Sequence, residues 1–75
     1  MTNLSTWPEV LSKLIRSEDI GREGASWALE EIMSGAATDS QIGAFLIGLR
    51  SKGETVEELA GLVDTMLKNA IRPEV

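Results

Sequence analysis

The chain has 75 residues, a formal net charge of −5, and neither cysteine nor histidine. This length fits one small domain, and 43% hydrophobic and 25% charged residues are ordinary proportions for a folded protein. Nucleic acid and anionic membrane surfaces are disfavoured as partners, because both need clustered Lys and Arg. Without Cys or His, the chain cannot form disulfides and lacks the commonest metal ligands and general bases.

Targeting signals are missing from the sequence as well. The longest apolar run is far shorter than the ~20 residues that a membrane span needs. The first residues show no charged-then-apolar pattern of a secretory signal. We therefore expect a cytoplasmic protein that does not bind a membrane.

Start and stop signals predict four helices, over residues 7–17, 22–34, 39–52 and 56–71, and no strand. The connections between them are short, which favours compact neighbours. The fold class predicted from the sequence is therefore all-α, with residues 1–75 forming a single helical domain.

Three of the helices begin with a predicted capping box, in which a Thr and a Glu or Gln side chain each bond to the other's backbone N–H group. The three pairs are Thr6 with Glu9, Thr38 with Gln41, and Thr55 with Glu58. The second helix has only Gly21 as its predicted N-cap, and Gly24 weakens its first turn. We therefore expect the start of this helix to fray.

The most informative stretch is residues 42–49, which contain no polar residue. A helix that is apolar on every side must be buried on every side. We therefore predict a compact four-helix domain with this third helix at its centre. Three other short helices cannot easily cover all of it, so the stretch also predicts a partner surface.

The other helices carry apolar stripes at helical spacing, which we expect to face the core. In the fourth helix this stripe consists of Val56, Leu59, Ala60, Val63, Leu67 and Ala70, and Leu62 and Met66 widen it. The pattern therefore predicts that the fourth helix buries its large apolar side chains inside the domain.

Trp27 stands apart from the apolar face of the second helix. At helical spacing it falls nearly opposite Leu29 and Ile32, among acidic residues. It is either a chance surface residue or a contact with another domain or subunit, since Trp is enriched at interfaces.

No set of residues indicates catalysis or metal binding. The pairs Glu30-Glu31 and Glu57-Glu58 could be imagined as carboxylate ligands. Adjacent residues on a helix point about 100° apart, so neither pair converges by itself. We expect both pairs on solvated faces, and we assign no catalytic, cofactor-binding or metal-binding residue to this chain.

Residues 37–61 closely resemble the amino-terminal helical domain of the anthranilate phosphoribosyltransferase family. The segment Lys52-Gly53-Glu54-Thr55 is the most specific part, since the wider nucleoside phosphorylase and glycosyltransferase family has other residues after Lys-Gly. Ile32-Met33-Ser34-Gly35 and Met66 also fit, so the resemblance covers nearly the whole chain. Gly21 and Gly24 depart from the family pattern, which usually has Ser or Thr and Glu at these places.

The resemblance implies a larger, homodimeric enzyme of tryptophan biosynthesis. Such an enzyme transfers the phosphoribosyl group of phosphoribosyl pyrophosphate to anthranilate, with Mg²⁺ on the pyrophosphate. In that family the phosphate loop, the metal-binding acids and the anthranilate site lie in a following α/β catalytic domain, whose motifs are not among these residues. The resemblance therefore implies a non-catalytic helical dimerisation domain here, with no cofactor of its own and Mg²⁺ only in the full-length enzyme.

Homodimerisation is predicted through the first and third helices, because small residues of the third helix allow another backbone to approach. The predicted interface consists of Leu11, Leu14, Gly43, Ala44, Ile47 and Gly48. Arg72 and Pro73 end the fourth helix and are the expected hinge into the α/β domain.

A second hypothesis is a free-standing helical module that binds a partner protein through the same apolar surface. A reading frame that continues into a Gly-Thr-Gly-Gly-Asp loop favours the enzyme, and a stop codon after Val75 favours the module. Under either hypothesis we expect no transferase activity from this chain alone.

Overall fold

A computed structural model describes residues 6–70 of the chain. It contains four helices, α1 (Trp7–Ile15), α2 (Gly21–Met33), α3 (Asp39–Lys52) and α4 (Val56–Ala70). No strand occurs between residues 6 and 70, so the predicted all-α domain of four helices is confirmed. The predicted helix ends lie within two residues of the observed ones.

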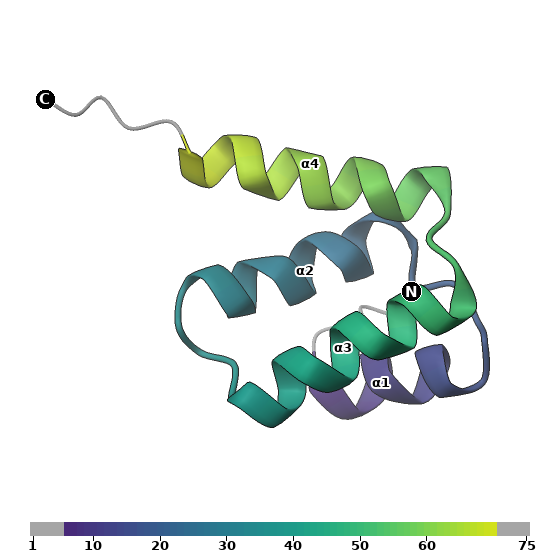
Figure 1. Cartoon of the computed structure of the whole chain (residues 1–75). Coiled ribbons are helices and arrows are strands. Elements are labelled where there is room, and N and C mark those ends of the chain that lie inside the picture. The colour runs from purple at the N-terminus through teal and green to yellow at the C-terminus, as the bar shows by residue number, and fades with distance from the viewer. Residues whose placement is uncertain (1–5, 71–75) are drawn as a thin grey trace, which may run out of the picture.

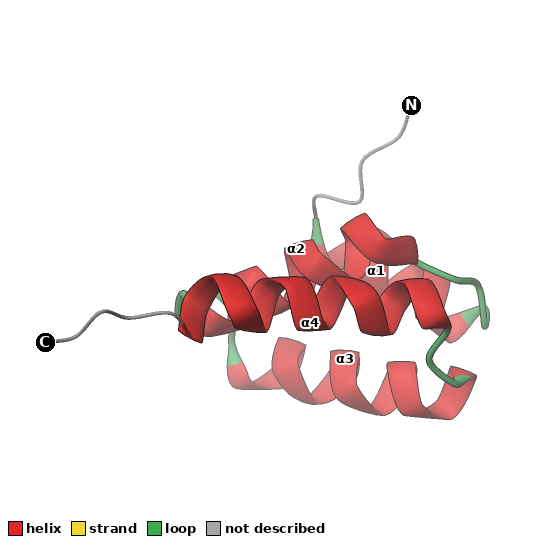
Figure 2. Ribbon diagram, turned by 90° about the horizontal axis from the view of Figure 1, so that it is seen from above, coloured by secondary structure: helices red, strands yellow, loops and turns green. Residues whose placement is uncertain are grey.

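The helices are arranged as two pairs (Figures 1 and 2). α1 packs mainly against α3, and α2 packs mainly against α4. The connections from α1 to α2 and from α3 to α4 lie at the same end of the molecule (Figure 1). Seen from above, α3 runs along one edge of the molecule (Figure 2). The expected burial of α3 on every side is not complete within one chain, because α4 packs on α2 and leaves Leu46 and Ile47 of α3 exposed.

The core lies where the two helix pairs meet. Its buried apolar residues are Trp7, Val10, Leu14, Ile20, Ala25, Ala28, Phe45 and Leu49. Trp7 lies at its centre, with its ring centroid 5.0 Å from that of Trp27 and 5.9 Å from that of Phe45. Since such aromatic pairs stabilise by roughly 0.5–1.5 kcal/mol beyond their buried area, this cluster is a strong link between the helix pairs.

Trp27 is half-buried against this core. The prediction that it lies opposite the packed face of α2 is therefore wrong. α2 packs on more than one side, since α4 covers one flank and the Trp7 ring covers another. The apolar spacing of the second helix indicates only the side that carries aliphatic residues. It does not reveal that a second side, with Trp27, is packed as well.

The capping boxes of α3 and α4 are confirmed. Thr38 and Gln41 bond each other's backbone N–H groups at 3.2 and 3.0 Å, and Thr55 and Glu58 do so at 3.0 Å each. At α1, Thr6 accepts a bond from the Glu9 N–H at 3.4 Å, while no return bond from the Glu9 side chain is seen within residues 6–70.

α2 begins differently from the sequence prediction. It starts at Gly21 itself, so Ile20 takes the N-cap position that was predicted for Gly21, and it has no side-chain cap of its own. The helix ends at Met33, one residue before the predicted end, and Gly35 follows the C-cap residue Ser34 with a φ of 83°.

Candidate interaction surfaces

A buried ion pair joins the two helix pairs at the end of the molecule that contains the α1–α2 and α3–α4 connections. Nζ of Lys52, the last residue of α3, lies 2.7 Å from Oε1 of Glu58 in the first turn of α4. The Glu58 side chain is fully buried, and the Lys52 side chain is 4% exposed. Lys52 also donates to Oδ1 of Asp19 at 3.2 Å and to the carbonyl oxygen of Gly53 at 2.9 Å. All three N–H groups of the ammonium therefore have acceptors.

Glu58 accepts bonds from two backbone N–H groups as well. Its Oε1 atom accepts from Thr55 at 3.0 Å, and its Oε2 atom accepts from Ile20 at 2.7 Å. Burial disfavours the charged carboxylate, but the bonds from Lys52 and the two amides outweigh burial and lower the pKa of Glu58. Burial also opposes the charge on Lys52, but its bonds to Glu58 and Asp19 raise the pKa of that ammonium. The pair is therefore held in its charged form.

The expectation that Glu57 and Glu58 both lie on a solvated face is wrong for Glu58. Glu57 is exposed, whereas Glu58 turns inward to cap its own helix and to meet Lys52. The capping-box pattern was the local signal for this orientation. The bond to Ile20 joins residues 38 apart in the chain, so no local pattern indicates it.

α4 packs on α2 through small and polar residues. A Cβ atom on Gly61 would overlap the backbone oxygen of Arg22, so the two helices approach as closely as only glycine permits. Next to this contact, the hydroxyl groups of Ser26 and Thr65 lie 2.7 Å apart. The seam between α2 and α4 therefore contains few large apolar side chains.

Most of the large apolar residues of α4 face away from the domain. We call this surface the α4 flank, and its residues are 47–79% exposed: Val56, Leu59, Val63, Met66 and Leu67. The prediction that this stripe faces the core is therefore wrong for these five residues, whereas Leu62, which also belongs to the predicted stripe, is half-buried against the core. Helical spacing identified the stripe correctly, but Gly61 and Thr65 are the residues that α2 covers.

A second apolar surface lies on the other helix pair. Exposed apolar residues of this pair are Ile15 on α1 and Ala44 and Ile47 on α3, and we refer to them together as the α1/α3 surface. Ile15 is 81% exposed and Ile47 is 72% exposed, and Ala44 is exposed as well. Leu46, which is 53% exposed, also leaves α3 partly uncovered. α3 is therefore not buried on every side within one chain. This incomplete cover was expected, and it is the reason why a partner surface was predicted.

Two residues of the predicted dimer interface contact each other within one chain. Leu14 is 3% exposed, and a Cβ atom on Gly48 would lie 3.1 Å from its Cβ atom. A larger side chain at residue 48 would therefore act first on the packing of α1 against α3. Sequence reasoning also missed Ile15, because it belongs to the general apolar stripe of α1.

The other predicted interface residues are more accessible. Ala44 and Ile47 are exposed, and Leu11 is half-buried against the core. Gly43 is half-buried, with no atom within 4 Å of the place its Cβ would occupy. These four residues remain available to a partner, and their place in a dimer stays a prediction.

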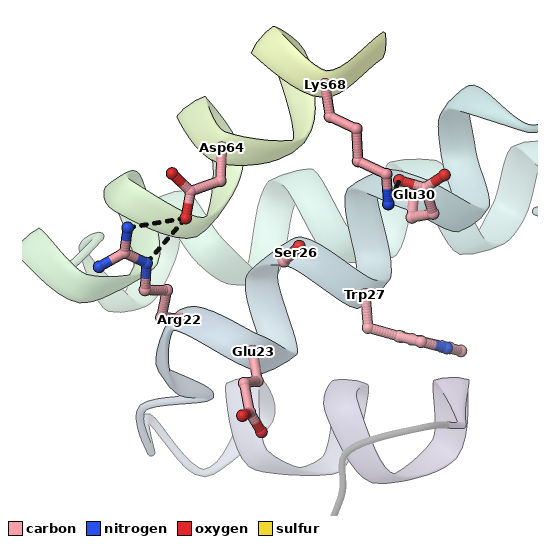
Figure 3. Close-up of a pocket in the computed structure, with 7 residues that line it drawn as sticks. All are labelled: Arg22, Glu23, Ser26, Trp27, Glu30, Asp64 and Lys68. Atoms are coloured by element: carbon pink, nitrogen blue, oxygen red, sulfur yellow. Dashed lines mark hydrogen bonds and ion pairs between the residues drawn. The ribbon is translucent and has the colours of Figure 1, made fainter.

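A shallow pocket of about 400 Å³ lies along the seam between α2 and α4 (Figure 3). Two ion pairs cross it, Arg22 with Asp64 at 2.8 Å and Glu30 with Lys68 at 3.8 Å. In Figure 3 the Trp27 side chain points away from the seam. The four charged residues of these ion pairs are paired with one another, and the fifth, Glu23, is exposed, so the pocket offers no converging set of groups for a small molecule.

Metal ligands do not gather in the described part of the chain, since no three acidic side chains between residues 6 and 70 lie close enough to hold an ion. No described helix is long and apolar enough to cross a membrane. The predicted hinge residues Arg72 and Pro73 lie outside the described residues.

Four short helices that leave several large apolar residues exposed define a small helical bundle domain. Residues 8–70 match the family described as the helical bundle domain of a glycosyl transferase family. The chain belongs to this family.

Individual relatives make the likeness more specific. The chain is 54% identical over 66 residues to the anthranilate phosphoribosyltransferase of Arthrobacter sp. (strain FB24), which covers 88% of the chain and 19% of the relative. It is 57% identical over 63 residues to the enzyme of that name from Nocardioides sp. (strain ATCC BAA-499 / JS614), covering 84% of the chain and 18% of the relative. The chain thus spans about a fifth of the length of these curated relatives.

Proposed function

We propose that this chain is the N-terminal helical domain of an anthranilate phosphoribosyltransferase, and that it carries no catalytic group itself. The whole protein would transfer the phosphoribosyl group of phosphoribosyl pyrophosphate to anthranilate, in tryptophan biosynthesis. The observation that carries the proposal is the family match over residues 8–70, with about half of the aligned residues identical in the relatives named above. The uncovered apolar surfaces support it, because they suit a domain that is one part of a larger protein.

The α4 flank is the surface that we assign to the α/β catalytic part of the same polypeptide. Its residues are large, apolar and about half exposed, which is unfavourable unless other protein covers them. Most of the length of the relatives lies outside the matched segment, so ample protein exists to cover it. Covering this flank would also hold α4 against α2.

A chimeric enzyme tests the proposed function. Residues 1–75 would replace the matched segment of the Arthrobacter relative, and we expect the purified chimera to form phosphoribosyl anthranilate. Val63→Arg in the chimera should abolish most of this activity, because it places a charge in the α4 flank. Ser40→Arg, which adds the same side chain at an exposed polar position, should leave the activity unchanged. An inactive chimera that is nevertheless folded would contradict the proposal.

The α1/α3 surface is the one that we assign to a second copy of the chain. A two-fold dimer covers the same patch on both subunits. Ile47 and Ile15 supply the large side chains of such a contact, and exposed Ala44 allows close approach. This assignment separates the two surfaces, with dimerisation on α1 and α3 and the catalytic part on α4.

Self-association of the 75-residue chain tests this assignment by analytical ultracentrifugation. We expect a monomer–dimer equilibrium in the micromolar range, and Ile47→Arg should weaken it at least tenfold, since burying an unpaired charge costs more than about 1.4 kcal/mol. Val63→Arg, on the α4 flank, should leave the dimer largely intact. If Val63→Arg dissociates the dimer and Ile47→Arg does not, the two surfaces are assigned the wrong way round.

A further inference from the structure

We propose that Glu58 caps two helices at once, α4 and α2, and so makes the first turn of α2 depend on the docking of α4. One carboxylate oxygen serves each helix. Oε1 accepts from the N–H of Thr55, the residue before α4, and Oε2 accepts from the N–H of Ile20, the N-cap residue of α2.

The comparison with α3 shows what this bond does. In the capping box of α3, the third helical residue Gln41 accepts the N–H of the N-cap residue Thr38 at 3.0 Å. Glu58 holds the same position in α4 and makes the same bond to Thr55. Its second oxygen repeats this bond for Ile20, at 2.7 Å and fully buried. Glu58 therefore supplies to α2 the half of a capping box that α2 lacks.

α2 has little else to hold its start. Its own third residue, Glu23, is exposed and makes no bond to the Ile20 N–H, and Ile20 has no side chain that could cap the helix. Gly24 lies in its first turn and favours the helix less than Ala by about 1 kcal/mol, and Gly21 has a φ of 76°, which is outside helical geometry. A helix with this beginning frays unless a group from elsewhere in the fold stabilises it.

The Glu58 carboxylate can reach the start of α2 only while α4 lies on α2. Glu58 reaches Ile20 because the Gly61 contact with Arg22 brings the two helices together, and Lys52 keeps the carboxylate charged. Anything that binds the α4 flank and holds α4 in place therefore also orders the start of α2. The shared cap is thus a device that transmits docking on one helix to the end of another.

Amide hydrogen exchange of the 75-residue chain, followed by NMR, tests the proposal. Glu58→Gln keeps the size of the side chain but replaces one accepting oxygen by an NH₂ group. The expected result is about tenfold faster exchange at residues 25–27, whose amides form the first internal bonds of α2, with little change at residues 43–45 of α3. Gln41→Ala is the matched control and should accelerate exchange at residues 43–45 while sparing α2.

Equal acceleration of α2 and α3 in Glu58→Gln would overturn the proposal. If Glu58→Gln does not fold, native-state exchange of the unchanged chain in low denaturant decides the question. Residues 25–27 and the first turns of α4 should then open together, with one shared dependence on denaturant and before α3 opens. Opening of residues 25–27 while α4 stays closed, or only together with α3, would refute a shared cap.

Discussion

Gly61→Ala is expected to detach α4 from α2 and to lower the free energy of unfolding by about 3 kcal/mol or more. The added Cβ would overlap the backbone oxygen of Arg22 and would lie 3.0 Å from its carbonyl carbon. Backbone atoms of a helix cannot turn aside as a flexible side chain can, so the helices must separate. A domain of this size has roughly 4–11 kcal/mol of stability in total, so the loss is a large fraction of it.

Gly43→Ala is the matched control for this prediction. No atom lies within 4 Å of the place that the Cβ of residue 43 would occupy. An Ala in the interior of α3 should therefore stabilise the monomer by up to about 1 kcal/mol, through helix propensity alone. Urea unfolding of both variants measures the difference, and equal stabilities for the two would contradict the close contact of α2 with α4.

Lys52→Met is expected to destabilise the domain by about 3–5 kcal/mol, because it leaves the Glu58 carboxylate buried without its cation. The four-carbon stem of Lys52 is replaced by a side chain of similar length, so the loss reflects charge more than packing. Lys68→Met is the control. Its partner Glu30 lies 3.8 Å away and the Lys68 side chain is 71% exposed, so the change should cost less than about 1 kcal/mol.

The same ion pair predicts how stability depends on pH. The pKa of Glu58 is lowered in the folded chain, so its contribution is fully present above its ordinary value of 4.5 and is lost as pH falls through the folded value. The pKa of Lys52 is raised, so its contribution is present below its ordinary value of 10.5 and is lost as pH rises through the folded value. In Lys52→Met the alkaline loss should disappear. Thermal unfolding across the pH range measures both limbs, and an unchanged alkaline limb would show that another group causes it.

The positions of the helices could be predicted from the sequence, because each end carries local chemistry. Thr38 and Thr55 with their partners fix two starts, and Gly35 and Gly53 follow two ends. These signals depend on residues three or four apart, and sequence reasoning sees such spacings directly. The family resemblance also rests on neighbouring residues, most specifically those at the end of α3 and in the turn after it. The family match over residues 8–70 confirms it.

The inner and outer faces of the helices were harder to predict. Large apolar residues were expected inside, yet α4 turns Gly61 and Thr65 inward and leaves Val63 and Met66 outside. Hydrophobic spacing finds an apolar stripe but does not tell whether that stripe meets the rest of the same chain or another protein. The isolated Gly61 inside a helical pattern is the one local feature that indicates close packing on this side of α4.

The contacts of the candidate surfaces depended on long-range pairing that no local pattern contains. Glu58 meets Ile20 across 38 residues, and Gly48 meets Leu14 because α1 pairs with α3. The partner surface predicted from residues 42–49 nevertheless has a physical basis, since Ile47 and Leu46 are exposed in the single chain. The sequence does not indicate which helices pack against each other. This pairing decides whether a residue is buried or lies on one of the exposed surfaces.

Fragment complementation tests most directly the claim that this chain is one part of a larger transferase. The 75-residue chain would be mixed with the remainder of the Arthrobacter relative, expressed without its matched segment, and phosphoribosyl anthranilate formation would be measured for each part and for the mixture. We expect no activity from the chain alone, little from the remainder, and a saturable gain in the mixture that Val63→Arg abolishes. Activity of the chain alone, or a remainder that is fully active and gains nothing from the chain, would contradict the account.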